Sequence, residues 1–196
     1  MNFDRHLELR GKHAFFSASN YHWIRYDLDK MREVYQNHLA TLRGTQLHDL
    51  AARCIGLGIN LPSSRKTLNQ YVNDAIGYRM IAEQPLFYSP NFFGTTDAIS
   101  FRKKLLRIHD LKTGVTPASM DQLKVYAAFF CLERGLKPEA LDMEFRIYQN
   151  NDISVLNPDR SEIGEIMNKA VVFNNEVIRM REGAGIDAEE EMVGID

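Results

Sequence analysis

Apolar positions recur three and four apart through much of the first eighty residues, which is the spacing of one helix face. Leu47 to Cys54 and Leu68 to Ile76 both follow this spacing. Gly56 and Gly58 come after the first run and supply a C-terminal stop. The pattern therefore predicts that residues 17–79 are mostly helical.

A longer helical stretch precedes these two runs. Ser19 is a residue type that caps helix N-termini, and apolar positions continue from Trp23 to Tyr35. Gly44 and Thr45 then interrupt or restart the helix. We expect the first helix to begin at Ser19.

The period changes after residue 79. Three short runs rich in aromatic and aliphatic residues occupy 80–87, 92–101 and 105–111, separated by a Ser-Pro-Asn turn and by the charged tip 102–104. They predict three consecutive strands, of which the last two form a hairpin.

Helical and strand patterns alternate in the remainder of the chain. Residues 120–134 return to helical spacing, and two strand-like runs, 142–148 and 153–156, follow. Asp159 and Glu162 have the spacing of a capping box for a final helix. The order predicts an α/β fold of the α+β kind: helices, a three-stranded antiparallel meander, a helix, further strands and a C-terminal helix.

The domain organisation follows from the same pattern. We expect a single domain over residues 1–182, with a helical part at 17–79 and a sheet core at 80–157. Residues 183–196 differ in kind, because a flexible Gly-Ala-Gly joint leads into an acidic end. This tail is either a solvated terminus or a segment that binds a protein partner.

Composition narrows the class of protein. With 196 residues, 44% of them hydrophobic and 26% charged, the chain suits one soluble globular domain. Its longest apolar run, Val125 to Leu132, has eight residues, whereas a membrane span needs about 20. The first ten residues lack an apolar signal-peptide core. We expect a cytoplasmic protein with no membrane partner.

Cysteine usage and charge exclude further classes. Cys54 and Cys131 belong to no Cys-x-x-Cys pair, so the chain can build neither a zinc knuckle nor a four-cysteine iron-sulfur cluster. The net charge of −2 argues against a generally basic nucleic-acid coat, but it leaves room for a local basic groove.

Two acidic residues stand out on the predicted hairpin. Asp97 and Asp110 are about equally far from its turn, so they fall opposite one another, with Cβ atoms about 4.5 to 5.5 Å apart. Lys112 shares a strand face with Asp110, while Leu111 points the other way into the core. Two carboxylates this close repel each other unless a positive charge lies between them.

A divalent cation resolves that repulsion. Oxygen ligands with at most one histidine favour Mg²⁺ or Mn²⁺, as one ion or two, over zinc. Such a site activates water and neutralises charge on a phosphoryl group, while Lys112 stabilises the developing oxyanion or orients the water. This chemistry is phosphodiester hydrolysis. The alternative is that Asp97 and Asp110 are ordinary strand-end carboxylates with Lys112 as their surface partner.

These residues resemble the PD-(D/E)XK nucleases, in particular the RecB-like branch that includes lambda-type phage exonucleases. The branch shows a Gly-x-x-Asp strand followed by an Asp/Glu-x-Lys strand, and Gly94 to Asp97 and Asp110 to Gly114 look like these motifs. The resemblance spans most of residues 17–150 and implies a restriction-endonuclease-like core.

The resemblance also implies roles for residues outside the two strands. His48, in a Gly-Thr-Gln-Leu-His stretch, is similar to the family's metal-binding histidine, and Glu83 to its additional glutamate near the metals. The Leu111 backbone carbonyl would be a further metal ligand. The remaining implied positions would contact DNA or support the site: Gln122, Tyr126, Thr113 and Ser19. Apart from the resemblance, the charge of the hairpin tip makes Arg102 and Lys103 candidate phosphate contacts.

Each role has a structural alternative. His48 is also a polar neighbour of the core, and Gln122 and Tyr126, four apart, are also one face of an amphipathic helix. Glu83 is also a solvent-facing strand residue, and a charged hairpin tip is usually a solvated turn.

The family resemblance makes a metal-dependent deoxyribonuclease the leading hypothesis. It would be an exonuclease on linear duplex or single-stranded DNA, acting in recombination, repair or phage genome processing. Processivity would call for a homo-oligomeric ring, since one small domain encloses DNA poorly. The alternatives are a structure-specific or internal endonuclease of the same fold, and a non-catalytic DNA-binding or interaction subunit.

Overall fold

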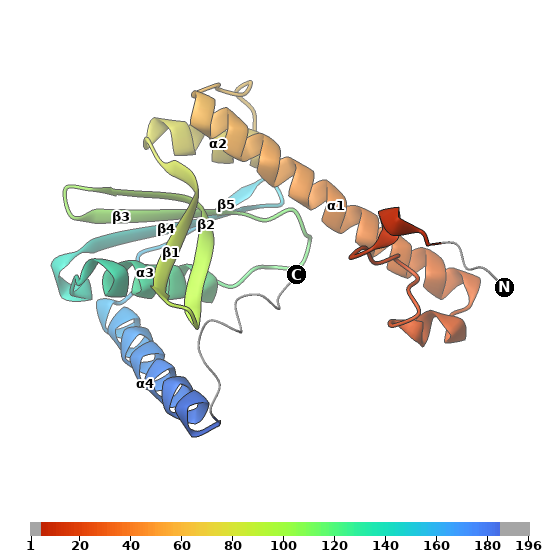
Figure 1. Ribbon diagram of the computed structural model, residues 1–196. Coiled ribbons are helices and arrows are strands. Elements are labelled where there is room, and N and C mark those ends of the chain that lie inside the picture. Colours follow the sequence, from red (N-terminus) through yellow and green to blue (C-terminus); the bar gives the residue numbers. More distant parts are fainter. Residues whose placement is uncertain (1–4, 185–196) are drawn as a thin grey trace. The chain divides into compact units, whose positions relative to one another are not determined.

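The computed structural model describes residues 5–184 (Figure 1). The chain divides into two compact units, one up to Arg43 and one from Gly44 onward. This division lies within helix α1 (Leu28–Leu57) and therefore inside the region predicted to be helical, residues 17–79.

The first unit contains two short 3₁₀ turns, η1 (Leu7–Leu9) and η2 (Tyr21–Arg25), and the first part of α1. The prediction that a helix begins at Ser19 is wrong, because the residues after it form only the short turn η2 and the α-helix begins at Leu28. The helix begins later, where Asp27 Oδ1 accepts a hydrogen bond of 2.7 Å from the backbone N–H of Lys30. Asp27 is therefore the capping residue.

The expected interruption at Gly44 is also wrong, since α1 runs unbroken through this buried residue. The expected stop is confirmed. Gly58 has a φ of 66°, and the N–H groups of Gly58 and Ile59 bond back to the carbonyls of Ile55 and Cys54 at 3.2 and 2.9 Å. Glycine adopts this left-handed conformation without steric cost.

The second unit follows the predicted order of elements. After the end of α1 come α2 (Thr67–Gly77), β1 (Ile81–Ser89), β2 (Phe92–Arg102), β3 (Leu105–Leu111), α3 (Asp121–Arg134), the short turn η3 (Pro138–Ala140), β4 (Asp142–Gln149), β5 (Asp152–Leu156) and α4 (Arg160–Ala184). Within the described residues the fold is thus a mixed α/β arrangement of four α-helices and five strands.

The five strands form one mixed sheet in the order β1-β2-β3-β4-β5. The first three strands make the predicted antiparallel meander, β4 lies parallel to β3, and β5 returns antiparallel to β4. A parallel neighbour requires a crossover connection, which α3 and η3 supply between β3 and β4.

Helices cover both faces of this sheet (Figure 1). On one face, Leu106 and Ile108 of β3 pack in a core with α3, and Ile163 of α4 joins it. On the other face, Ala98 and Leu111 pack with α2 and the last turns of α1. Alternate residues of β3 therefore serve two different cores, as the period of a strand requires.

The β2–β3 hairpin turns at Lys103 and Lys104, which have φ values of 48° and 65°. Left-handed backbone at both positions is the geometry of a two-residue hairpin turn whose twist matches the strands. Arg102 pairs with Leu105 across it. The turn expected from the charged tip is confirmed, and it fixes the register of the two strands.

The capping box predicted for the last helix forms only in part. Asp159 Oδ1 accepts the N–H of Ser161 at 2.9 Å, but the Glu162 carboxylate lies 3.2 Å from Lys124 Nζ. The helix α4 continues to Ala184, so Gly183 belongs to a helix and not to a flexible joint. The acidic tail predicted from this joint otherwise falls on residues 185–196, outside the described part of the chain.

Within residues 5–184, none of the helices combines the length and the apolar character needed to cross a lipid bilayer.

A buried polar network ties α2 to the centre of the sheet. Tyr148 Oη donates to Asp74 Oδ2 at 2.7 Å and lies 3.2 Å from Nδ1 of the fully buried His109, and Arg146 reaches Asp74 at 3.2 Å. The Nε2 atom of His109 is buried with no hydrogen-bond partner among the described residues. Burial, together with the charges of Arg146 and Arg107, lowers the pKa of His109 to about 3.

His109 therefore makes folding sensitive to acid. Between pH 6.5, the ordinary histidine pKa, and pH 3 the unfolded chain takes up a proton at His109 that the folded chain does not. The free energy of unfolding should fall across this window, by about 4 to 5 kcal/mol in full. Urea denaturation of His109→Gln at several pH values should show a shallower dependence than the unsubstituted protein. His13→Gln, at an exposed position, is the control; equal slopes for both variants would contradict the assignment.

Candidate active site

Three strands bring three carboxylates into one row. The β2–β3 pairing ends at Ala98 and His109, and Asp97 and Asp110 are the next residues of the two strands beyond this last pair. On the β1 side, Glu83 lies between residues that pair with Ala98 and Thr96, which places it beside Asp97. Neighbouring like charges destabilise a sheet unless other groups compensate them.

The two aspartates find different partners. Asp97 Oδ2 accepts the backbone N–H of Leu111 at 2.8 Å and lies 3.5 Å from Nδ1 of His48. Asp110 contacts Lys112, whose Nζ lies 3.1 Å from Oδ1 and 2.9 Å from Oδ2. The structure thus places a cation or a donor against each carboxylate.

A chain of side-chain contacts leads from Asp110 to α3. Lys112 Nζ donates to Gln122 Oε1 at 2.9 Å, and Gln122 Nε2 donates to the hydroxyl oxygen of Tyr126 at 3.0 Å. Gln122 and Tyr126 share a helix face because they are four residues apart. These contacts connect four residues in one set: Asp110, Lys112, Gln122 and Tyr126. The family resemblance predicts that they belong to one site, whereas their spacing along the chain does not.

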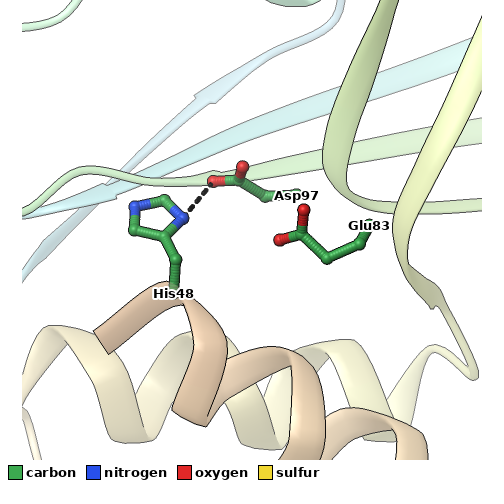
Figure 2. A group of neighbouring side chains, drawn as sticks. All are labelled: His48, Glu83 and Asp97. Atoms are coloured by element: carbon green, nitrogen blue, oxygen red, sulfur yellow. Dashed lines mark ion pairs between the residues drawn. The ribbon is translucent and has the colours of Figure 1, made fainter. Parts of the chain in front are cut away.

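The closest group of potential metal ligands gathers around Asp97 (Figure 2). His48 points from α1 toward Asp97, Glu83 lies beside it on β1, and one ligand atom from each residue falls within 4.8 Å of the others. One imidazole and two carboxylates at this spacing can share one cation, and hard oxygen ligands suit Mg²⁺ or Mn²⁺. Asp110 is not a member of this closest group, although it is the next residue in the row.

The surroundings of the Asp110 carboxylate suit a cationic partner. Its side chain is 3% exposed, and Oδ2 receives no directed hydrogen bond from any described residue, despite its short distance to Lys112 Nζ. Burial and the nearby charge of Asp97 raise the pKa of Asp110, and Lys112 opposes this shift. Asp110 Oδ2 is therefore available as a further ligand for a cation held by the neighbouring carboxylates.

The other two ionisable ligands are shifted by the same charges. The hydrogen bond with Asp97 is the largest of the effects that raise the pKa of His48, and burial opposes it. Burial followed by the charge of Asp97 raises the pKa of Glu83, which is itself an exposed residue. Asp97 thus contributes to the raised pKa of both His48 and Glu83.

Glu83 also has an unusual backbone. Its φ is 51°, inside strand β1, where extended backbone has negative φ. A residue with a β-carbon adopts positive φ at some energetic cost, and such strain concentrates at functional sites. The edge position of β1 permits the distortion, since only β2 pairs with it. No periodicity argument predicts this feature.

Two glycines of the predicted motifs permit close approach of a neighbouring element. A β-carbon at Gly44 would lie 2.8 Å from Thr113 Oγ1, and one at Gly94 would lie 3.0 Å from Tyr126 Cε1. Gly44 thereby allows α1 to pack against the residue that follows Lys112. Gly94 allows β2 to pack against the aromatic ring at the end of the contact chain described above.

Gln149 is a functional candidate that sequence reasoning missed. Its Nε2 donates to the carbonyls of Gly114 and Thr116 at 2.6 and 2.8 Å, and its Oε1 accepts the N–H of Ala118 at 3.2 Å. One side chain thus holds the loop between Lys112 and α3. Its partners lie 31 to 35 residues away in the sequence, so no local pattern reports them.

Two predicted binding residues, both at the hairpin tip, are not brought to this site. Arg102 and Lys103 lie at the hairpin tip, five residues along β2 from Asp97, which corresponds to roughly 17 Å of strand. Ser19 belongs to the unit that ends at Arg43. Thr113, in contrast, directly follows Lys112 and contacts the Gly44 position, as described above.

The Gly44 contact is open to a direct test. Gly44→Ala should have a free energy of unfolding about 1 to 3 kcal/mol below that of Gly56→Ala, because the added methyl group would overlap Thr113 Oγ1, whereas both variants gain the same helix propensity. The double variant Gly44→Ala with Thr113→Ala should recover most of the loss, measured by urea denaturation. Gly56→Ala is the matched control on the same helix, since its β-carbon meets nothing within 4 Å. A Gly44→Ala protein as stable as Gly56→Ala would refute the close contact.

Comparisons with known proteins do not extend this description. No protein-family model, curated protein or solved structure matches the chain.

Proposed function

We propose that this protein is a divalent-metal-dependent nuclease that hydrolyses phosphodiester bonds in DNA, acting as an exonuclease on linear molecules. The observation that carries the proposal is the group of His48, Glu83 and Asp97, whose ligand atoms lie within 4.8 Å of one another. Beside it, the Leu111 N–H bonds to Asp97, and Lys112 contacts Asp110 on the same strand end. The restriction-endonuclease-like identity of the core is part of this proposal.

The donor set fits a divalent cation. His48, Glu83 and Asp97 would hold it from one side, with Asp110 and the Leu111 carbonyl completing the ligands on β3. When bound, Mg²⁺ or Mn²⁺ supplies activated water and neutralises charge on the phosphoryl oxygens.

Lys112 is positioned to serve the reaction directly. Its ammonium group carries three N–H donors, and contacts with Asp110 and Gln122 engage two of them. Among the described residues no further partner of the ammonium group is seen, and we assign its remaining donor capacity to a water or a phosphoryl oxygen. A fixed positive charge at that point stabilises the negative charge that accumulates in the transition state, because the group is already oriented.

Gln122 and Tyr126 then act as positioning residues. Gln122 orients Lys112 through its carbonyl oxygen, and Tyr126 orients Gln122 through its hydroxyl oxygen. Burial raises the pKa of Tyr126, so the phenol stays protonated at neutral pH. These two residues link the helix that follows the catalytic strands to the reacting centre.

Substitution of Lys112 tests the mechanism. With Mg²⁺ or Mn²⁺, Lys112→Ala should hydrolyse end-labelled linear DNA about 10²- to 10³-fold more slowly, because one preoriented charge is lost. It should still bind Mn²⁺ in a calorimetric titration, which also shows that the protein is folded. Lys137→Ala, at an exposed position before β4, should cleave at the unsubstituted rate. Equal rates for Lys112→Ala and Lys137→Ala would exclude the assigned role.

Substitution of Asp97 tests the metal site. Asp97 contributes to the closest ligand group and contacts His48, so Asp97→Asn should weaken Mn²⁺ binding at least tenfold and abolish cleavage. Asp121→Asn, on an exposed carboxylate, is the control for charge alone. Cleavage of closed circles would indicate an internal endonuclease, and DNA binding without cleavage of any substrate would indicate a binding subunit.

A further inference from the structure

A cavity of about 330 Å³ opens directly beside the catalytic lysine. It is bounded by the end of β3, the start of α2, the turn between β4 and β5 and one residue of α1; the lining residues are Leu47, Lys66, Thr67, Leu68, Leu111, Lys112, Thr113, Asn150 and Asn151. The cavity therefore adjoins the lysine of the candidate active site.

The chemistry of the lining is that of a site for an anion with an apolar part. Its only ionised side chains are Lys66 and Lys112, and no carboxylate lines it. Lys112 is already balanced by Asp110, whereas the exposed Lys66 forms no ion pair with any described residue. Leucine side chains supply the apolar surface, which inorganic phosphate alone would not need.

The cavity is held in shape by hydrogen bonds. Asn151 Oδ1 accepts the N–H of Thr67 at 3.1 Å, and the N–H of Asn151 donates to Thr67 Oγ1 at 2.7 Å. Asn150 Nδ2 donates to the Val115 carbonyl at 3.3 Å, in the loop that Gln149 also holds. A site that is already formed loses less conformational entropy on binding.

We propose that this cavity binds the nucleotide that adjoins the scissile phosphate, with its phosphate on Lys66 and its sugar or base against the leucine side chains. The inference rests on the proposed function, which supplies the identity of the anion as a nucleotide. The volume lies at the low end of the roughly 300 to 1,000 Å³ of small-ligand sites, so it admits one nucleotide unit. The bound unit is either a link of a DNA strand or the mononucleotide released from it.

Affinity measurements with chelator present separate binding from hydrolysis. Lys66→Gln should bind a fluorescent single-stranded oligonucleotide about fivefold more weakly, and the salt dependence of binding should fall by about one phosphate contact. Lys66→Arg should keep the affinity, because the charge is retained. Lys137→Gln is the matched exposed control.

Competition identifies the source of the nucleotide. A deoxynucleoside monophosphate that displaces the oligonucleotide from the unsubstituted protein, but not from Lys66→Gln, supports a site that retains the product. An effect of Lys66→Gln on oligonucleotides alone supports a site for a link within the strand. Competition by the nucleoside without phosphate, equal in both proteins, would overturn the role of Lys66.

The cleavage assay distinguishes this inference from the proposed function. If the unsubstituted protein cleaves DNA while Lys66→Gln equals Lys137→Gln in both affinity and KM, the nucleotide site is refuted and the nuclease stands. If no DNA is cleaved while Lys66→Gln still binds more weakly than Lys137→Gln, the nuclease is refuted and a nucleotide-binding site stands.

Discussion

The register of the β2–β3 hairpin is the constraint on which the site depends. Side chains alternate between the two faces of a strand, so a slip of one residue would move Asp97 to the face that packs against α2. The left-handed turn at Lys103 and Lys104 prevents that slip from one end. At the other end, the hydrogen bond from the Leu111 N–H to Asp97 ties the carboxylate itself to the neighbouring strand.

The same register explains why one strand carries both residues of the candidate site and residues of the core. Along β3, Ile108 and Asp110 point toward α3, whereas His109 and Leu111 point toward α2. Movement of β3 toward either core would therefore displace Asp110. On the opposite face, hydrogen bonds among Tyr148, Asp74 and Arg146 hold β4 against α2. Because β4 pairs with β3, these bonds also restrain the strand that carries Asp110.

Most of the fold was predictable because its signals are local. Strand periodicity, the charged tip of the hairpin and the glycine that ends α1 each act within a few residues, and the structure confirms all three. The start of α1 was not predictable from the sequence, because Ser19 and Asp27 are both capping residue types and the apolar periodicity does not distinguish between them. Gly44 was misinterpreted for a related reason: glycine reads as a break, whereas here it admits Thr113.

The candidate site, like the fold, was predictable only where its signals are local in the sequence. Counting along a hairpin predicted that Asp97 and Asp110 lie at the same end of adjacent strands, whereas no pattern encodes the positive φ of Glu83. Gln149 and Lys66 enter through contacts between segments distant in sequence. Gln149 ends β4 and Lys66 directly precedes α2, so the surroundings of Lys112 are set by tertiary packing. The carboxylates come from the three strands β1, β2 and β3. The cavity beside them is lined by residues from several helices, strands and loops of the second unit.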